Sequence, residues 1–281
     1  GADLGAMAAS AKLFVNIPFA VLLLFFTITT LILEVFVAYP TYAKFLKYLT
    51  FALFAYIITA FFVKQNWWDT LYFTFVPSIS LTSDYIFNIV AILGTTISPY
   101  LFFWQADEEI EEEINHHKLR AMGKGIPKIF TRDISEMRLD TTVGMFFSNV
   151  VMFFIIIATA GTLHLNGIYS IQTADQAAEA LKPLAGNFAS LLFAIGVIGT
   201  GLLAVPILAG SAAYAVAELF KWKAGLGLQF QKAHGFYGVI TIATLVGLCV
   251  NFTSISPFQM LYYTAIINGI VAPPLLVLIL L

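Results

Sequence analysis

The stretch Leu93-Gly-Thr-Thr-Ile-Ser-Pro-Tyr-Leu-Phe-Phe-Trp-Gln105 predicts a helix that is broken in the middle of the membrane. Apolar residues precede it from Ile89, and an aromatic run follows it. Pro99 has no amide hydrogen and clashes with the carbonyl four residues earlier, so the helix must open at Ile97-Ser98-Pro99. In hydrocarbon an open backbone is tolerated only where protein buries it or where it lines a polar cavity. Many secondary transporters build ion sites from such broken helices; a simple proline kink is the alternative.

The composition is that of a protein that crosses a membrane several times. Of 281 residues, 60% are apolar and only 11% are charged, and the mean hydropathy is +0.89. Soluble domains carry about 25% charged residues, so we expect an all-α polytopic membrane protein. The net charge of −2 argues against a nucleic-acid partner. The single cysteine, Cys249, excludes an internal disulfide, and no catalytic-triad or phosphate-loop pattern points to an enzyme.

Seven hydrophobic stretches, the broken helix among them, are long enough, at about 20 residues, to span a bilayer as helices. We expect spans at 17–39, 41–64, 84–106, 141–163, 187–220, 236–253 and 257–281. The broken helix is expected to extend over about 84–114, followed by a cytoplasmic, partly helical loop at 115–140. The chain starts without methionine and stops inside an apolar run. We therefore interpret residues 1–281 as a single transmembrane domain that is truncated at both ends.

Basic residues set the expected orientation. Eleven of the fourteen Lys and Arg residues follow the first, third and fifth of these spans, and only Lys12, Lys64 and Lys182 lie on the other side. By the positive-inside rule the first side is cytoplasmic. The loop at 66–83, which carries Trp67 and Trp68, is then outside.

Oxygen atoms at the break are candidate ligands for a cation. Opening at Pro99 frees the carbonyls of Gly94 to Ile97, and with the Ser98 hydroxyl these oxygens suit hard cations such as Mg²⁺, Mn²⁺ and Ca²⁺. The free amides of the second half-helix would instead favour an anion. This local chemistry leaves the charge of the substrate open.

Other polar residues in the spans each allow two interpretations. Asp3 is either a carboxylate in an ion path or an interfacial group. Asn149 and Asn268 lie midway along their spans and either bond a neighbouring helix or complete a polar site. Glu34 is expected to be structural or to extend toward the interface. The six carboxylates within Asp107 to Glu113 form either a solvated helix end or an acidic vestibule that concentrates cations.

The chain resembles the Nramp (natural resistance-associated macrophage protein) family of divalent metal-ion transporters. Gly94-Thr-Thr-Ile-Ser-Pro99 with its aromatic half-helix is similar to the sixth helix of that family. Asp3-Leu4-Gly5-Ala6 is similar to the acidic motif of helix three, and Phe147-Ser-Asn-Val150 to the seventh helix. The resemblance covers the whole chain, as helices three to ten. It implies a LeuT-like inverted-repeat fold, alternating access, and a metal ion held between broken helices one and six.

The resemblance also implies which residues contact the ion. In the family, helix six supplies a backbone carbonyl and, three residues later, a methionine sulfur; the matching positions here are Thr95 and Ser98. A soft ligand favours transition metals over Mg²⁺ and Ca²⁺, so its replacement by a hydroxyl predicts a harder preference, with magnesium beside manganese. Two family histidines associated with proton movement match Tyr100 and Gln105, and a helix-three glutamate matches Ala6. These departures put proton coupling in doubt.

We therefore expect a divergent prokaryotic member of this family that moves divalent cations across the bacterial inner (plasma) membrane. The expected partners are the metal ions and the lipid bilayer, with no cofactor and no obligate protein partner. The candidate site residues are Thr95 and Ser98 as metal ligands, Asn149, Asn268, Tyr100 and Gln105 as supporting or gating groups, and Asp3 as an ion-path carboxylate. Two alternatives stay open: a transporter of the same fold for an organic substrate such as an amino acid, and a non-transporting sensor relative.

Overall fold

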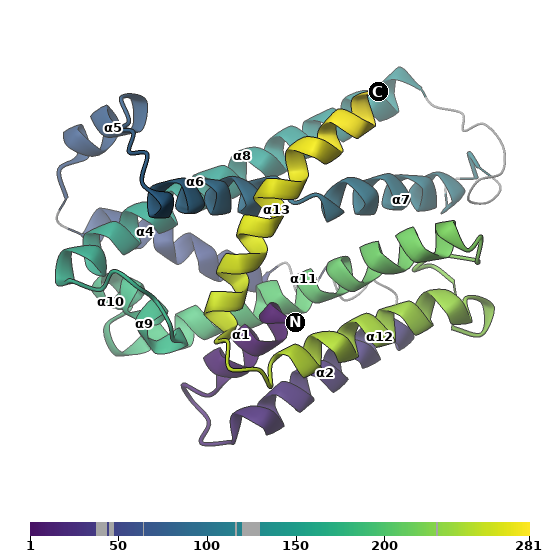
Figure 1. Cartoon of the computed structure of the whole chain (residues 1–281), viewed down its shortest axis with the longest axis horizontal. Helices are drawn as coiled ribbons and strands as arrows, with labels where there is room; N and C mark the ends of the chain where they lie inside the picture. Colours follow the sequence, from purple (N-terminus) through teal and green to yellow (C-terminus); the bar gives the residue numbers. More distant parts are fainter. Residues whose placement is uncertain (38–43, 45–47, 64, 116, 120–129, 229) are drawn as a thin grey trace.

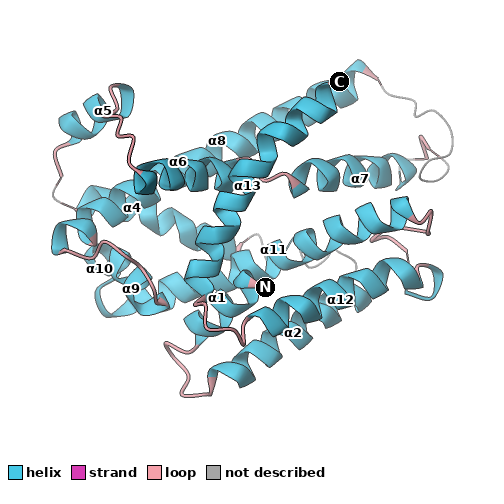
Figure 2. Cartoon of the chain, viewed as in Figure 1, coloured by secondary structure: helices cyan, strands magenta, loops and turns pink. Residues whose placement is uncertain are grey.

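A computed structural model shows an all-α chain. It describes residues 1–281 except 38–43, 45–47, 64, 116, 120–129 and 229. The described residues form helices and loops, with no strand among them (Figure 2). Five helical segments there are long and apolar enough to cross a membrane: Phe19–Phe36, Ser83–Ile114, Thr131–Asn166, Ala174–Leu219 and Pro257–Leu280. With two shorter apolar helices, Phe51–Phe62 and His234–Val250, they confirm the prediction of an all-α, multi-pass membrane protein.

The helices follow the predicted spans closely (Figure 1). The α-helices are α1 (Ala2–Ala11), α2 (Phe19–Phe36), α4 (Phe54–Phe62), α5 (Trp67–Phe75), α6 (Ser83–Thr96), α7 (Tyr100–Asn115), α8 (Thr131–Thr162), α9 (Ala174–Ala178), α10 (Lys182–Ala185), α11 (Ala189–Leu219), α12 (His234–Val250) and α13 (Pro257–Leu280). Short 3₁₀ turns lie at η1 (Leu49–Leu53), η2 (His164–Asn166), η3 (Glu179–Leu181), η4 (Gly186–Phe188) and η5 (Phe230–Lys232). Part of the span expected at 41–64 falls outside the described residues.

The loop after α7 is shorter than the expected 115–140, because α8 already begins at Thr131. The Asp133 carboxylate accepts a hydrogen bond from the Phe130 amide (2.9 Å) and so satisfies one free donor at the start of this helix. Lys118 Nζ lies 2.8 Å from Asp133 Oδ2. This hydrogen-bonded pairing raises the pKa of Lys118 above its ordinary value and ties the end of α7 to the start of α8.

Four helices, α1, α2, α11 and α12, pack into one group (Figure 1). Their contact surface holds fully buried apolar side chains such as Leu4, Met7 and Leu23. A β-carbon on Gly201 of α11 would lie 2.6 Å from Met7 Cγ, so only glycine lets α1 approach α11 this closely. This group is the core against which the second half of the broken helix packs.

The first half of the broken helix packs elsewhere, against α13. A β-carbon on Gly94 of α6 would lie 1.8 Å from the Ala265 carbonyl oxygen, and one on Gly269 of α13 would lie 2.2 Å from the Val90 carbonyl oxygen. The two helices therefore touch backbone to backbone through their glycines. This contact fixes the position of α6 up to the break.

Candidate functional site

The predicted break is present. The last hydrogen bond of α6 runs from the Ile97 amide to the Leu93 carbonyl (2.8 Å), and Ile97 itself leaves the helical region with φ −111° and ψ 79°. Helix α7 starts afresh at Tyr100, with the Leu101 amide bonded to the Ser98 carbonyl at 3.0 Å. Residues 97–99 thus connect two half-helices, as the lack of an amide hydrogen on Pro99 requires.

The break leaves backbone oxygens without their helical donors. In a continuous helix the Thr95 carbonyl would accept from residue 99, which is proline and has no N–H. The Thr95 hydroxyl is not available in the same way, because it donates to the Ile92 carbonyl at 2.7 Å. Thr95 therefore presents a carbonyl oxygen without its helical donor, while its hydroxyl is oriented back along α6.

Ser98 adds a buried hydroxyl to these oxygens. Its side chain is 7% exposed, and its Oγ lies 3.5 Å from the Gly94 carbonyl oxygen. This distance is long for a hydroxyl hydrogen bond, whose usual range is about 2.5–3.0 Å. The hydrogen bond from Ser98 Oγ to the Gly94 carbonyl is thus weak, and the lone pairs of Oγ could accept a cation.

Tyr100 lies next to Ser98. The Tyr100 phenol interacts with the Ser98 side chain, and the half-buried Asp3 carboxylate on α1 acts on the same phenol electrostatically. Tyr100 of α7 is thus paired with Ser98 at the break, while Asp3 influences it only through its charge.

The other predicted site residues, Asn149, Gln105 and Asn268, make no hydrogen bond to Ser98 or Tyr100 among the described residues. Asn149 is exposed on α8 and donates to the Met145 carbonyl of its own helix at 2.8 Å. Gln105 is exposed on α7 and donates to Glu109 Oε1 at 3.0 Å. Asn268 is half-buried on α13, beside the glycine that contacts α6.

Carboxylates elsewhere do not form a ready metal site. Among the described residues, no group of three or more His, Cys, Asp or Glu is arranged to hold a metal ion. Any ion at the break would be held mainly by backbone and hydroxyl oxygens. The acidic run is not simply solvated, however, because Asp107 is only 5% exposed.

Glu34 was expected either to be structural or to extend toward the interface, and its burial fits the first of these. It is 4% exposed between α2 and α12. Thr244 of α12 lies beside it, but neither carboxylate oxygen has a partner in hydrogen-bond geometry. The tight packing of α2 against α12, which the sequence does not reveal, encloses this group.

The residues that attach α7 to α11 were not predicted from the sequence. Ser211 Oγ of α11 donates to the Tyr100 carbonyl (3.2 Å), and Trp104 covers Gly210, where a β-carbon would lie 2.4 Å from the indole. The small residues of α11 were a visible signal for close helix contact. Their partner helix could not be read from the sequence.

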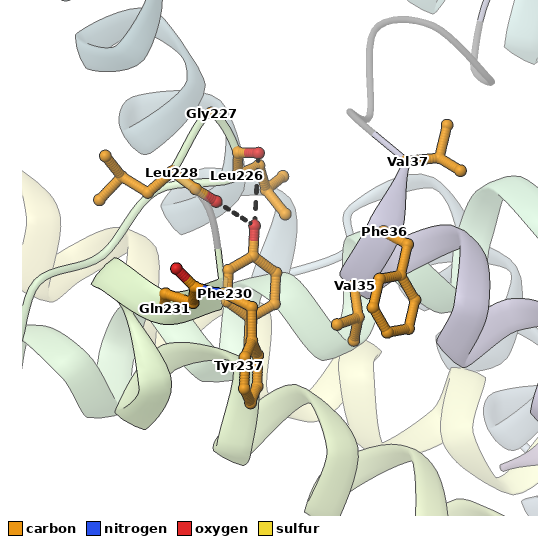
Figure 3. A pocket seen from close by; sticks show the side chains of 9 residues that line it. All are labelled: Val35, Phe36, Val37, Leu226, Gly227, Leu228, Phe230, Gln231 and Tyr237. Carbon is orange, nitrogen blue, oxygen red and sulfur yellow. Dashed lines mark hydrogen bonds between the residues drawn. The ribbon is translucent and has the colours of Figure 1, made fainter.

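A cavity of about 490 Å³ lies at one end of the molecule, between the end of α2 and the turn that joins α11 to α12 (Figure 3). Val35, Phe36 and Val37 form one side of it, and Leu226 to Leu228 form the other. The Tyr237 hydroxyl donates to the Leu228 carbonyl at 2.7 Å at its edge (Figure 3). The cavity is distinct from the break.

Comparison with known proteins identifies a family for this chain. The Nramp family, described as natural resistance-associated macrophage protein-like, matches residues 1–281. The chain is similar to the "Divalent metal cation transporter MntH" of Caldanaerobacter subterraneus subsp. tengcongensis, at 26% identity over 155 residues, which are 52% of this chain and 32% of the relative. A protein of the same name from Clostridium acetobutylicum is 25% identical over 148 residues, which are 53% of this chain and 32% of that relative.

The matched part spans about a third of the length of these curated relatives. The family match, in contrast, extends over every residue of the chain. The same residues form an all-α architecture with membrane-length helices, one of which is broken at Ser98-Pro99. The chain belongs to the Nramp family.

Proposed function

We propose that this protein is a secondary transporter that moves divalent metal cations across the bacterial inner membrane by alternating access. The supporting observation is the break between α6 and α7, which leaves the Thr95 carbonyl without a helical donor beside the buried Ser98 hydroxyl. Both curated relatives are named as divalent metal cation transporters. A cation is favoured over an anion because the free groups at Thr95 and Ser98 are oxygens.

The ligand chemistry favours magnesium or manganese. The ligands that the break offers are hard oxygen donors, and Ser98 stands where a softer side chain would bias the site toward transition metals. Magnesium prefers such all-oxygen coordination and retains some of its water. We therefore expect Mg²⁺ to compete effectively with Mn²⁺.

Transport is proposed to proceed without proton coupling. Tyr100 and Gln105 occupy the positions at which the family resemblance would place proton-linked histidines. A phenol has an ordinary pKa of about 10 and an amide does not titrate, so neither exchanges protons near neutral pH.

Metal uptake into liposomes that contain the full chain and an internal pH dye tests this function. We expect Mn²⁺ or Mg²⁺ to enter down its gradient without acidification of the lumen. Strict dependence of uptake on a proton gradient would overturn the uncoupled mechanism. Uptake of an amino acid, with no flux of any divalent metal, would overturn the proposed substrate class.

A further inference from the structure

Glu111 holds three hydrogen bonds that join separate parts of the chain. It lies on α7, and its carboxylate accepts from the Tyr214 hydroxyl of α11. It also accepts from the Leu226 amide (2.7 Å) and the Gly227 amide (3.1 Å), which belong to the turn between α11 and α12. Hydrogen bonds to an ionised carboxylate are among the stronger ones in proteins. Glu111 therefore ties α7 to both α11 and this turn.

The same turn is held from its other side by α12. The Tyr237 hydroxyl donates to the Leu228 carbonyl at 2.7 Å, while Leu226 to Leu228 form a wall of the 490 Å³ cavity (Figure 3). Gly225 has φ +146°, a backbone conformation that favours glycine, and a β-carbon there would lie 3.0 Å from Glu111 Oε1. The turn is thus shaped to receive the carboxylate.

The two halves of the broken helix are fastened to different helices. Helix α7 is attached to α11 along its length, at Tyr100 through Ser211, at Trp104 through Gly210, and at Glu111 through Tyr214. Helix α6 is attached to α13 through its glycines. No helical hydrogen bond crosses residues 97–99 from one half-helix to the other, because the Ile97 amide bonds back to Leu93 and the Ser98 carbonyl bonds forward to Leu101. The chain can therefore move α7 relative to α11 only by releasing these three contacts.

We propose that Glu111 is a positioning residue that latches α7 onto α11 and the α11–α12 turn, and that the transport cycle releases this latch so that α7 moves about the break. The inference rests on the proposed transport function, because it assigns a role in that cycle. The Trp104 and Ser211 contacts are a packing contact and a single neutral hydrogen bond. The Glu111 contacts are three hydrogen bonds to a carboxylate, and they hold the end of α7 that lies farthest from the break.

A thiol reporter beneath α7 tests the latch without requiring any metal. In the full chain with Cys249→Ser, the variant Ser211→Cys places a thiol at a site that is 4% exposed and faces α7. The rate of its reaction with a water-soluble thiol reagent in detergent measures how often α7 leaves α11. We expect Glu111→Gln to raise this rate about tenfold or more, because a neutral amide cannot satisfy all three donors.

Matched variants separate the latch from general loosening. Glu109→Gln removes another carboxylate of the same helix, one that accepts a hydrogen bond from the exposed Gln105 side chain, and it should leave the rate within about twofold. Equal rates in Glu109→Gln and Glu111→Gln would overturn the proposal. A second reporter, Ala158→Cys, lies fully buried in a separate core cluster, and its rate should not change with Glu111→Gln. A parallel rise at both reporters would show a merely structural role.

Tyr214→Phe keeps the test decisive if Glu111→Gln fails to fold. It removes one donor to Glu111 and keeps the buried ring, so we expect a smaller increase in the rate at Ser211→Cys. An unchanged rate would contradict the latch. Because the reporter is read without metal, absence of ion flux would count against the proposed function and leave the result for the latch intact.

Discussion

At the scale of single residues, the selectivity of the proposed site depends on Ser98. Its buried hydroxyl lies 3.5 Å from the Gly94 carbonyl oxygen, and the next carbonyl, that of Thr95, is the one that Pro99 deprives of a donor. A site made of these groups offers only hard ligands, and such ligands do not reject Mg²⁺. The expected preference is therefore a consequence of one side chain.

The variant Ser98→Met should shift ion preference toward softer metals. A thioether at this position adds a ligand that binds Mn²⁺ and Cd²⁺ better than Mg²⁺. We expect the ratio of Cd²⁺ to Mg²⁺ affinity to rise by about tenfold, which corresponds to about 1.4 kcal/mol. Titration calorimetry on the full chain measures both affinities.

Thr96→Val is the matched control for this change. The Thr96 hydroxyl donates to the Leu93 carbonyl at 2.9 Å, within its own helix, so its loss should leave the affinity ratio unchanged. An ion profile for Ser98→Met that equals the control profile would remove Ser98 from the set of ligands.

The sequence predicted some of these residues better than others. Pro99 breaks the helix through its own covalent structure. The position of the break next to Thr95 and Ser98 could therefore be predicted without knowing which helices pack around it. Asn149 and Gln105 were predicted from their position along a span, and the structure shows both exposed and bonded within their own helices. Which side of a helix faces a partner depends on tertiary packing, and a uniformly apolar membrane helix carries little pattern to reveal it.

At the scale of helices, the glycine contact between α6 and α13 sets where the first half-helix ends. The backbones meet at Gly94 and Gly269, and the Tyr262 hydroxyl adds a hydrogen bond to Asn88 Oδ1 at 2.9 Å. Such close approach gives van der Waals and polar contact that lipid cannot replace. The pair therefore acts as one support for the break.

Gly94→Ala should destabilise this pair. Even a single methyl group would lie 1.8 Å from the Ala265 carbonyl oxygen, so the helices must separate or tilt. Overpacking of this kind costs about 1–3 kcal/mol, which a lower thermal midpoint in detergent would show. Gly144→Ala on α8 is the control, because nothing lies within 4 Å of its added carbon. Equal thermal midpoints for the two variants would mean that the close contact does not support the fold.

Helix positions were predictable from hydropathy, whereas helix pairing was not. The spans expected at 17–39 and 257–281 became Phe19–Phe36 and Pro257–Leu280, within a few residues. That α6 pairs with α13, some 170 residues later in the chain, follows from complementary glycines on both helices. A single sequence shows the glycines but not their partners.

At the scale of the whole molecule, the charged loops gather at one end. The end of α7, the start of α8 and the turn between α11 and α12 lie on the same side, opposite α5, α9 and α10 (Figure 1). Of the basic residues that the structure describes, six lie in or next to the elements of the first group: Lys118, Arg132, Arg138, Lys221, Lys223 and Lys232. The arrangement fits the positive-inside expectation that this end faces the cytoplasm.

Single-cysteine labelling in intact cells measures this orientation. In a Cys249→Ser background, Lys223→Cys lies in the α11–α12 turn and Gln172→Cys lies before α9, and both positions are exposed. A membrane-impermeant thiol reagent should label the Gln172→Cys variant and spare the Lys223→Cys variant until the cells are opened. The reverse pattern would show that the charge bias does not set the topology.

A divalent cation held by the oxygens at the break between α6 and α7 would be located by anomalous X-ray scattering from crystals of the full chain soaked in Mn²⁺. We predict a peak within about 2.5 Å of the Thr95 carbonyl oxygen and of Ser98 Oγ, the range of metal–oxygen coordination. A peak confined to the acidic run at Asp107 to Glu113, with none at the break, would contradict this prediction.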